Sequence, residues 1–232
     1  MTGASEPRFG PWRRWLAEFV VIVVGVLVAL GVDAAREARE ERAREAAYLE
    51  QLHADLTTTA DSLRAAIAVE ETARAGGDRL LDALDGGELP PPDMLGTWLQ
   101  SATNWSTFQP NMGTVTALVE SGDFRLLRDP ILRQAVLQYH SEVVSALRII
   151  DGITPHTWRT VERLGALVNW RALNRPDAPG RFPVRWEVLA SDRAFHGALA
   201  DLGITTNNRI FALRGLRDAL DPLLARLESV VD

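Results

Sequence analysis

The hydrophobic positions of the chain begin with one continuous apolar run near its start. Residues 16–32 read LAEFVVIVVGVLVALGV, in which twelve of the seventeen side chains are Leu, Ile, Val or Phe and Glu18 carries the only charge. Counted from Trp12, the run forms a helix about 30 Å long, which matches the hydrocarbon thickness of a lipid bilayer. We therefore predict a single transmembrane helix over residues 16–32, after a short tail over residues 1–15.

Three residues inside this predicted span need separate consideration. The apolar side chains together favour insertion by about 4 to 7 kcal/mol, whereas Glu18 opposes it by at most about 3 kcal/mol. Insertion therefore remains favourable, and Glu18 either reaches the headgroup region or is a functional intramembrane carboxylate. Gly25 and Ala29 form a pair of small residues four apart, which would let two membrane helices pack closely.

A cleaved signal peptide is the alternative to a retained membrane helix. The tripeptide Ala29-Leu30-Gly31 offers small residues at the two positions that a signal peptidase reads. The helical pattern, however, runs on into AAREAREERAREAAYLEQL without the extended stretch that usually ends a signal peptide. The sequence therefore favours retention.

The pattern beyond the span is that of helices in water. Residues 33–47 are polar on every side and predict a charged helical stalk, whereas residues 48–232 predict a helical bundle domain. The bundle begins with a heptad stripe, as in a coiled coil: Leu49, Leu52, Leu56, Thr59, Leu63 and Ala66. The pair Gly76-Gly77 is expected to kink or end this first helix.

Linkers, capping residues and prolines delimit the remaining helices. Linkers rich in Pro or Gly are expected near 86–92 and 174–183. Four side chains are expected to cap helices: Asp93, Asn111, Asp129 and Asp192. Pro155 and Pro222 are expected to kink or interrupt helices, and two separate helices are expected over about 192–202 and 206–230. The period-two alternation of strands is missing, so we predict an all-α fold in which one transmembrane helix continues into a stalk helix and an extramembrane bundle.

The charge composition narrows the classes of partner. The net charge is −6, and every basic side chain is Arg. A GC-rich genome explains this bias more simply than selection for anion binding, because the Arg residues are scattered. The chain lacks the basic surface that nucleic-acid binding requires, so no nucleic-acid partner is expected. Cysteine is absent, which excludes disulfides and thiolate metal ligands.

Basic residues around the predicted span indicate an orientation. Arg8, Arg13 and Arg14 precede it in a short, positively charged tail. A plain count of Arg slightly favours a cytoplasmic location for the part of the chain after the span. The Arg residues there, however, are interleaved with acidic residues that can pair with them. We predict a single-pass protein of the bacterial inner membrane, with its bundle in the periplasm or an equivalent compartment.

Two stretches of the chain resemble a known family. The stretch EFVVIVVGVLVALGVDAAREAREERAREAAYLEQLHADL resembles the start of a family of small bacterial single-pass membrane proteins. The stretch PNMGTVTALVESGDFRLLRDPILRQAVLQYH resembles their second signature, whose recurring elements match Leu118, Ser121, Gly122, Leu127, Asp129, Leu132 and Tyr139. The family is catalogued only as a domain of unknown function. The resemblance implies a membrane anchor and a helical fold, without a reaction, a ligand or a catalytic residue.

Patterns typical of catalytic or metal sites are sparse. Glu50 and His53 have the Glu-x-x-His spacing of di-iron helical bundles, but the sequence holds no second such pair. Zinc-binding HExxH motifs and Gly-rich phosphate loops are also missing from the sequence. We therefore expect no metal and no cofactor, while an enzyme or metal-binding protein with a site around Glu50 and His53 stays an alternative.

An aromatic region is the best candidate for a ligand pocket. Four residues would line it between helices: Trp98, Trp105, Phe108 and Asn111. The alternative is that the aromatic side chains fill the core where helices cross. We expect a membrane-tethered interaction or sensory module that binds an unknown protein or small ligand. An oligomeric scaffold, assembled through the transmembrane or stalk helix, is a further alternative.

Overall fold

The computed structural model describes residues 11–122, 124, 126–174 and 181–231, without the side chains of residues 11–14, 17 and 231. It contains seven α-helices: α1 (Pro11–Asp85), α2 (Pro92–Ala102), α3 (Gly113–Ser121), α4 (Pro130–Leu167), α5 (Trp170–Asn174), α6 (Trp186–Leu189) and α7 (Arg193–Val231). The described residues form no strand, and the all-α prediction is confirmed.

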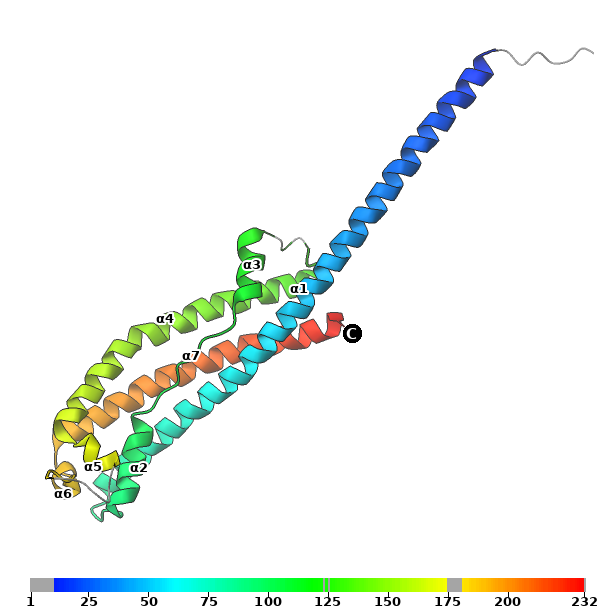
Figure 1. Cartoon of the computed structure of the whole chain (residues 1–232). Coiled ribbons are helices and arrows are strands. Elements are labelled where there is room, and N and C mark those ends of the chain that lie inside the picture. Colours follow the sequence, from blue (N-terminus) through cyan, green and yellow to red (C-terminus); the bar gives the residue numbers. More distant parts are fainter. Residues whose placement is uncertain (1–10, 123, 125, 175–180, 232) are drawn as a thin grey trace, which may run out of the picture. The chain divides into compact units, whose positions relative to one another are not determined.

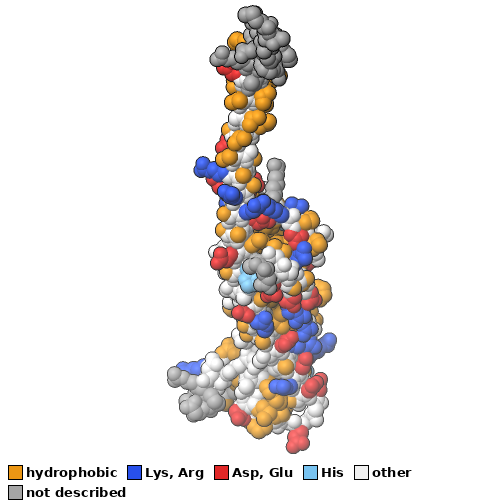
Figure 2. Space-filling model, turned by 90° about the vertical axis from the view of Figure 1, so that its right-hand side faces the viewer, with side chains coloured by type: hydrophobic (Ala, Val, Ile, Leu, Met, Phe, Trp, Pro, Cys, Tyr) orange, Lys and Arg blue, Asp and Glu red, His pale blue; other side chains and the backbone are white. Residues whose placement is uncertain are grey.

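The first of two structural units comprises residues 1–48. Its large hydrophobic side chains between residues 15 and 32 are all exposed, by 38% to 73%. Figure 2 shows hydrophobic side chains covering this segment. Among the described helices, only α1, in the part that begins at Glu18, is long and apolar enough to cross a membrane. Signal sequences share this property. The residues expected at the start of the span lie outside the described side chains: Arg8, Trp12, Arg13 and Arg14.

The second unit, residues 49–232, contains three long helical segments side by side (Figure 1). They are the second half of α1, together with α4 and α7. α7 runs antiparallel to α4, as two ion pairs show. Arg163 near the end of α4 pairs with Asp201 near the start of α7 at 2.7 Å, and Asp129 at the start of α4 pairs with Arg226 near the end of α7 at 2.6 Å. α1 and α4 run in the same direction, so the chain between them returns along the bundle.

The heptad stripe predicted on α1 packs into this bundle. All six of its positions are buried, each at 7% exposure or less: Leu49, Leu52, Leu56, Thr59, Leu63 and Ala66. The stripe continues toward the end of the helix through buried Glu70, Ala73, Leu80 and Leu84. The helical period of the sequence therefore identifies the face of α1 that the other helices cover.

Three of the short helices, α2, α5 and α6, gather at one end of the bundle, while α3 lies away from them (Figure 1). α2, α5 and α6 contribute to one apolar cluster there, together with parts of α1, α4 and α7. Its buried members include Leu84, Leu99, Leu173, Trp186 and Phe195. This cluster fixes the short helices against the ends of the long ones.

α2 packs against α1 where the two adjacent glycines occur. A Cβ atom on Gly76 would lie 2.7 Å from Ser101 Cβ and 2.9 Å from the carbonyl oxygen of Trp98. The absence of a side chain therefore allows the two helices to approach closely. α1 continues through Gly76 and Gly77 to Asp85, so the glycines do not end the helix, which is one of the two outcomes that the sequence predicts.

Two long helices continue through residues that the sequence predicts as interruptions. α4 contains Pro155 and α7 contains Pro222. Both prolines are exposed, so a carbonyl that loses its helical partner there can bind water. α4 is curved in Figure 1, and the two helices expected over 192–202 and 206–230 are one helix.

The predicted caps have mixed outcomes. Asp129 and Asp192 each accept a hydrogen bond from a backbone N–H two residues later, and both caps are confirmed. Asp93 instead lies in the first turn of α2, and α3 begins after Met112, so Asp93 and Asn111 are not the N-cap residues. Residues 104–112, which we call the strap, join α2 to α3 without regular secondary structure.

Candidate functional site

Polar side chains on the buried face of α1 hold the strap. Glu70 Oε1 accepts hydrogen bonds from Ser106 N at 2.8 Å and from Ser106 Oγ at 3.0 Å. Thr59 Oγ1 accepts a hydrogen bond from Asn111 N at 3.0 Å. Asp55 Oδ1 accepts one from Asn111 Nδ2 at 2.9 Å. Asn111, predicted to line a pocket, therefore attaches the strap to α1.

The strap runs lengthwise along α1 between these anchors. Ser106 and Asn111 are five residues apart, and a chain of that length reaches at most about 16 to 18 Å. Their partners Glu70 and Thr59 are eleven residues apart on one helix, which is about 16 Å along its axis. An extended strap is therefore long enough to reach from one anchor to the other.

Two oppositely charged side chains are buried where the strap meets the bundle. Glu70 is fully buried, and Arg209 on α7 is 2% exposed. Arg209 Nη2 donates a hydrogen bond to Thr157 Oγ1 on α4 at 2.8 Å, and its guanidinium carbon lies 5.7 Å from the ring centre of Trp105. Among the described residues, Glu70 Oε2 and Arg209 Nε have no hydrogen-bond partner.

Burial dominates the electrostatics of these two groups. Desolvation raises the pKa of Glu70, against the opposing effects of the Ser106 hydrogen bonds and the Arg209 charge. Desolvation likewise lowers the pKa of Arg209, against the attraction of Glu70. Buried charges of this kind rarely stabilise a fold as well as apolar side chains would, so they indicate a role in fixing a specific arrangement.

The aromatic residues predicted to share a pocket line two different hollows. Trp98, half-buried on α2, lines one of them with Glu71 and Arg79. Trp105 and Phe108, half-buried on the strap, line the other. The prediction of one aromatic pocket stays untested by any ligand, but the geometry separates Trp98 from the other two.

Trp105 also takes part in the packing of the bundle. Its ring lies edge-on against Trp158 of α4, with ring centres 4.9 Å apart. Such an edge-to-face pair is a favourable aromatic geometry. Trp105 therefore contacts the exposed Trp158 of α4 and the buried Arg209 while it is itself half-buried.

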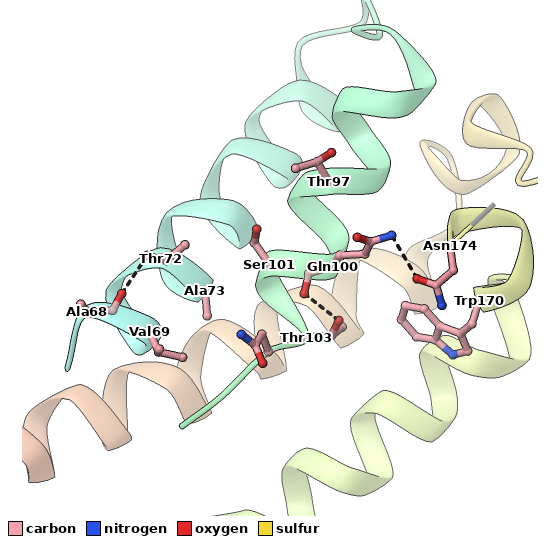
Figure 3. Close-up of a pocket in the computed structure, with 11 residues that line it drawn as sticks. Ala68, Val69, Thr72, Ala73, Thr97, Gln100, Ser101, Thr103, Trp170 and Asn174 are labelled. Carbon is pink, nitrogen blue, oxygen red and sulfur yellow. Dashed lines mark hydrogen bonds between the residues drawn. The ribbon is translucent and has the colours of Figure 1, made fainter. Parts of the chain in front are cut away.

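A larger hollow lies between α1, α2 and α5, and we call it the α2 groove (Figure 3). Its volume is about 720 Å³, which is within the range of about 300 to 1,000 Å³ typical of small-molecule sites. The described residues that line it are Ala68, Val69, Thr72, Ala73, Thr97, Gln100, Ser101, Thr103, Asn104, Trp170 and Asn174. None of these lining residues is ionisable.

The sequence holds no recognisable signal for the α2 groove. Its polar members are ordinary Thr, Ser, Asn and Gln residues, which most often face solvent on a helix. They come from three segments that are distant in the chain and become neighbours only in the fold. Trp170 is the one member that composition could have singled out.

The residues singled out in the predicted span lie in the exposed N-terminal segment. Glu18, Gly25 and Ala29 are all exposed, and a Cβ atom on Gly25 would meet no described atom within 4 Å. Close pairing of two such helices through Gly25 and Ala29 stays a hypothesis.

The Glu-x-x-His pair lies on the surface of α1. Glu50 is exposed and His53 is half-buried, with His53 Nε2 at 3.9 Å from Glu228 Oε1. In the part of the chain that the structure describes, no three His, Asp or Glu side chains gather as a metal site would require. The enzyme alternative therefore rests on the spacing of Glu50 and His53 alone.

The residues of the second family-like signature have structural roles. Four of them are fully or almost fully buried: Leu118, Leu127, Leu132 and Tyr139. Gly122 ends α3 with a φ of +73°, a backbone conformation that favours glycine, and Asp129 caps α4. These positions would therefore be constrained by folding.

No protein-family model, curated protein or solved structure matches the chain. The resemblance to small bacterial membrane proteins therefore stays a prediction, and the assignment of function rests on the geometry.

Proposed function

We propose that the protein is a single-pass membrane protein whose helical bundle binds a ligand or partner on the periplasmic side. The observation that carries the proposal is the exposure of every large hydrophobic side chain between residues 15 and 32. A segment of this kind is unfavourable in water, and its length matches a lipid bilayer. A bilayer would cover it completely.

Two observations support retention of this segment over its removal as a signal sequence. α1 is one continuous helix from Pro11 to Asp85, and residues 29–31 lie inside it. Signal peptidases read an extended segment, which this helix does not offer. Most of the exposed large hydrophobic residues among the described side chains also lie in this segment, and its loss would leave the bundle without an anchor.

The bundle itself supports a binding role. It carries the α2 groove at its surface, and the strap beside that groove is fixed by buried charged and polar groups. Asn104 lines the groove and belongs to the strap, whose residue Ser106 is bound by Glu70. A ligand in the groove would therefore contact the segment that links α2 to α3, as a sensory module requires.

Membrane fractionation tests the anchor. The full-length protein should stay in membranes after an alkaline carbonate wash, with its first thirty residues intact by mass spectrometry. A variant with Val23→Arg and Val24→Arg should be released. Full-length protein that is soluble without detergent would contradict the proposal.

Single-cysteine labelling tests the orientation, because the natural chain has no cysteine. Ser141→Cys, on the exposed face of α4, should react with an impermeant maleimide in intact spheroplasts. Ser5→Cys, in the tail, should react only after lysis. The reverse pattern would place the bundle in the cytoplasm.

A further inference from the structure

The α2 groove combines features that select a class of ligand. Its lining comes from α1, α2, α5 and the two residues after α2, and Figure 3 shows α2 between the α1 residues and those of α5. Charged residues make up 24% of the chain, yet the described lining of the groove contains none. An ionic ligand would find no ion pair in this lining, so the groove favours a neutral one.

The hydroxyl groups of the groove act mainly as acceptors toward a ligand. Thr72 Oγ1 donates to the Ala68 carbonyl at 2.7 Å, and Thr97 Oγ1 donates to the Asp93 carbonyl at 2.9 Å. Each hydroxyl proton is thereby used within its own helix, while the oxygen lone pairs stay available. The groove therefore presents one such acceptor on α1 and one on α2.

The amide groups of the groove add both donors and acceptors. Gln100 Nε2 donates to the Leu173 carbonyl at 3.2 Å and to Asn174 Oδ1 at 3.3 Å. This arrangement leaves Gln100 Oε1 as an acceptor and Asn174 Nδ2 as a donor (Figure 3). Asn104 is exposed at the same groove. A ligand that both donates and accepts along its length would satisfy these groups, whereas a hydrocarbon would not.

Trp170 supplies a flat apolar surface beside these polar groups. Figure 3 shows its indole ring next to Asn174, on the side of the groove across from α1. A Cβ atom on Gly165 of α4 would lie 3.0 Å from Trp170 Nε1, so the glycine leaves room for the ring. An aromatic face flanked by amides and hydroxyls is complementary to a sugar ring, which has apolar C–H faces and a rim of hydroxyl groups.

We propose that the α2 groove binds a neutral oligosaccharide, with Trp170 stacking on one sugar ring while Gln100, Asn104 and Asn174 bind its hydroxyl or amide groups. This inference rests on the proposed binding role of the bundle, but not on the side of the membrane. A neutral peptide is the competing ligand, and it is less well matched because it lacks a polar rim around an apolar face.

The test uses full-length protein in lipid nanodiscs, because glycoside detergents would compete for the groove. The protein is applied to an array of immobilised neutral and acidic glycans, and binding is then titrated with free maltotriose and triacetylchitotriose. We expect retention on neutral glycans. Trp170→Ala and Asn104→Ala should each weaken binding at least tenfold. Phe211→Ala, an exposed aromatic change on α7 outside the groove, should leave binding unchanged.

A further variant separates loss of binding from loss of folding. Gly165→Ala should preserve the helical circular dichroism signal and weaken binding, because its methyl group displaces the indole ring. Folded protein that binds no neutral glycan, or only acidic ones, would overturn the proposed ligand class and leave the membrane anchor standing. If the protein binds neutral glycans but is released from membranes by the carbonate wash, the membrane anchor is overturned and the proposed ligand class stands.

Discussion

Glu70 and Arg209 connect four segments at one level of the bundle. Glu70 belongs to α1 and binds the strap through Ser106, while Arg209 belongs to α7 and binds α4 through Thr157. Apolar side chains of similar volume would cost less to bury, but they would not distinguish one register of the helices from another. We infer that the pair sets the register of the strap and the long helices.

Removing one member of this pair should destabilise the protein strongly. We expect Glu70→Ala to lower the free energy of unfolding by about 3 to 5 kcal/mol, because it leaves the Arg209 charge buried without compensation. A double variant with Glu70→Leu and Arg209→Met should recover most of that loss. Urea unfolding, followed by circular dichroism, measures both. A double variant as unstable as Glu70→Ala would contradict the argument.

The buried Tyr139 should make the stability of the bundle depend on pH. Burial raises the pKa of Tyr139 to about 12, above the ordinary phenol value of 10.0. The folded state therefore holds its phenol proton more tightly than the unfolded state, so stability is lost as pH rises from about 10 to 12. The loss should reach about 2 to 3 kcal/mol relative to Tyr139→Phe. Tyrosinate absorbance should show one group titrating near pH 12 that is missing from the variant.

At the scale of elements, Gly76 and Gly77 should respond differently to the same substitution. Gly76→Ala places a methyl group against α2 and should cost about 1 to 3 kcal/mol through overpacking. The nearest atom to a Cβ on Gly77 is Ala102 Cβ at 3.6 Å, which is an ordinary contact. Gly77→Ala should therefore gain up to about 1 kcal/mol from helix propensity. Thermal unfolding of the two variants side by side checks the contrast.

The elements with strong periodicity are those that the sequence predicts well. The stripe from Leu49 to Ala66 follows directly from helical spacing, and the Asp129 cap follows from local chemistry. Pro155 and the two glycines do not end their helices, because their local effects are weaker than tertiary packing. The α2 groove is out of reach of sequence reasoning, since neutral polar side chains such as Thr72 and Gln100 give no pattern until the helices bring them together.

At the scale of the whole molecule, apolar surface is divided unevenly between the two units. Residues 15–32 expose a continuous apolar surface, while the surface of the bundle shows charges of both signs (Figure 2). The division falls after Tyr48, so the membrane-compatible part of α1 and its bundle part belong to different units. Composition along the chain is enough to predict this division, whereas it gives no information on what the bundle binds.

The strap sets the length of the connection between its two anchors on α1, so changes in the number of its residues should affect stability. Deleting Thr107 shortens the connection between the Glu70 and Thr59 anchors, and we expect one buried anchor to open, at about 1 to 3 kcal/mol. Inserting a glycine after Thr107 should cost only a few tenths of a kcal/mol. Hydrogen exchange at the Ser106 and Asn111 amides would show which anchor opens. We therefore expect this segment to tolerate added length better than lost length, because a shorter strap would detach one of its two anchors from the first helix of the bundle.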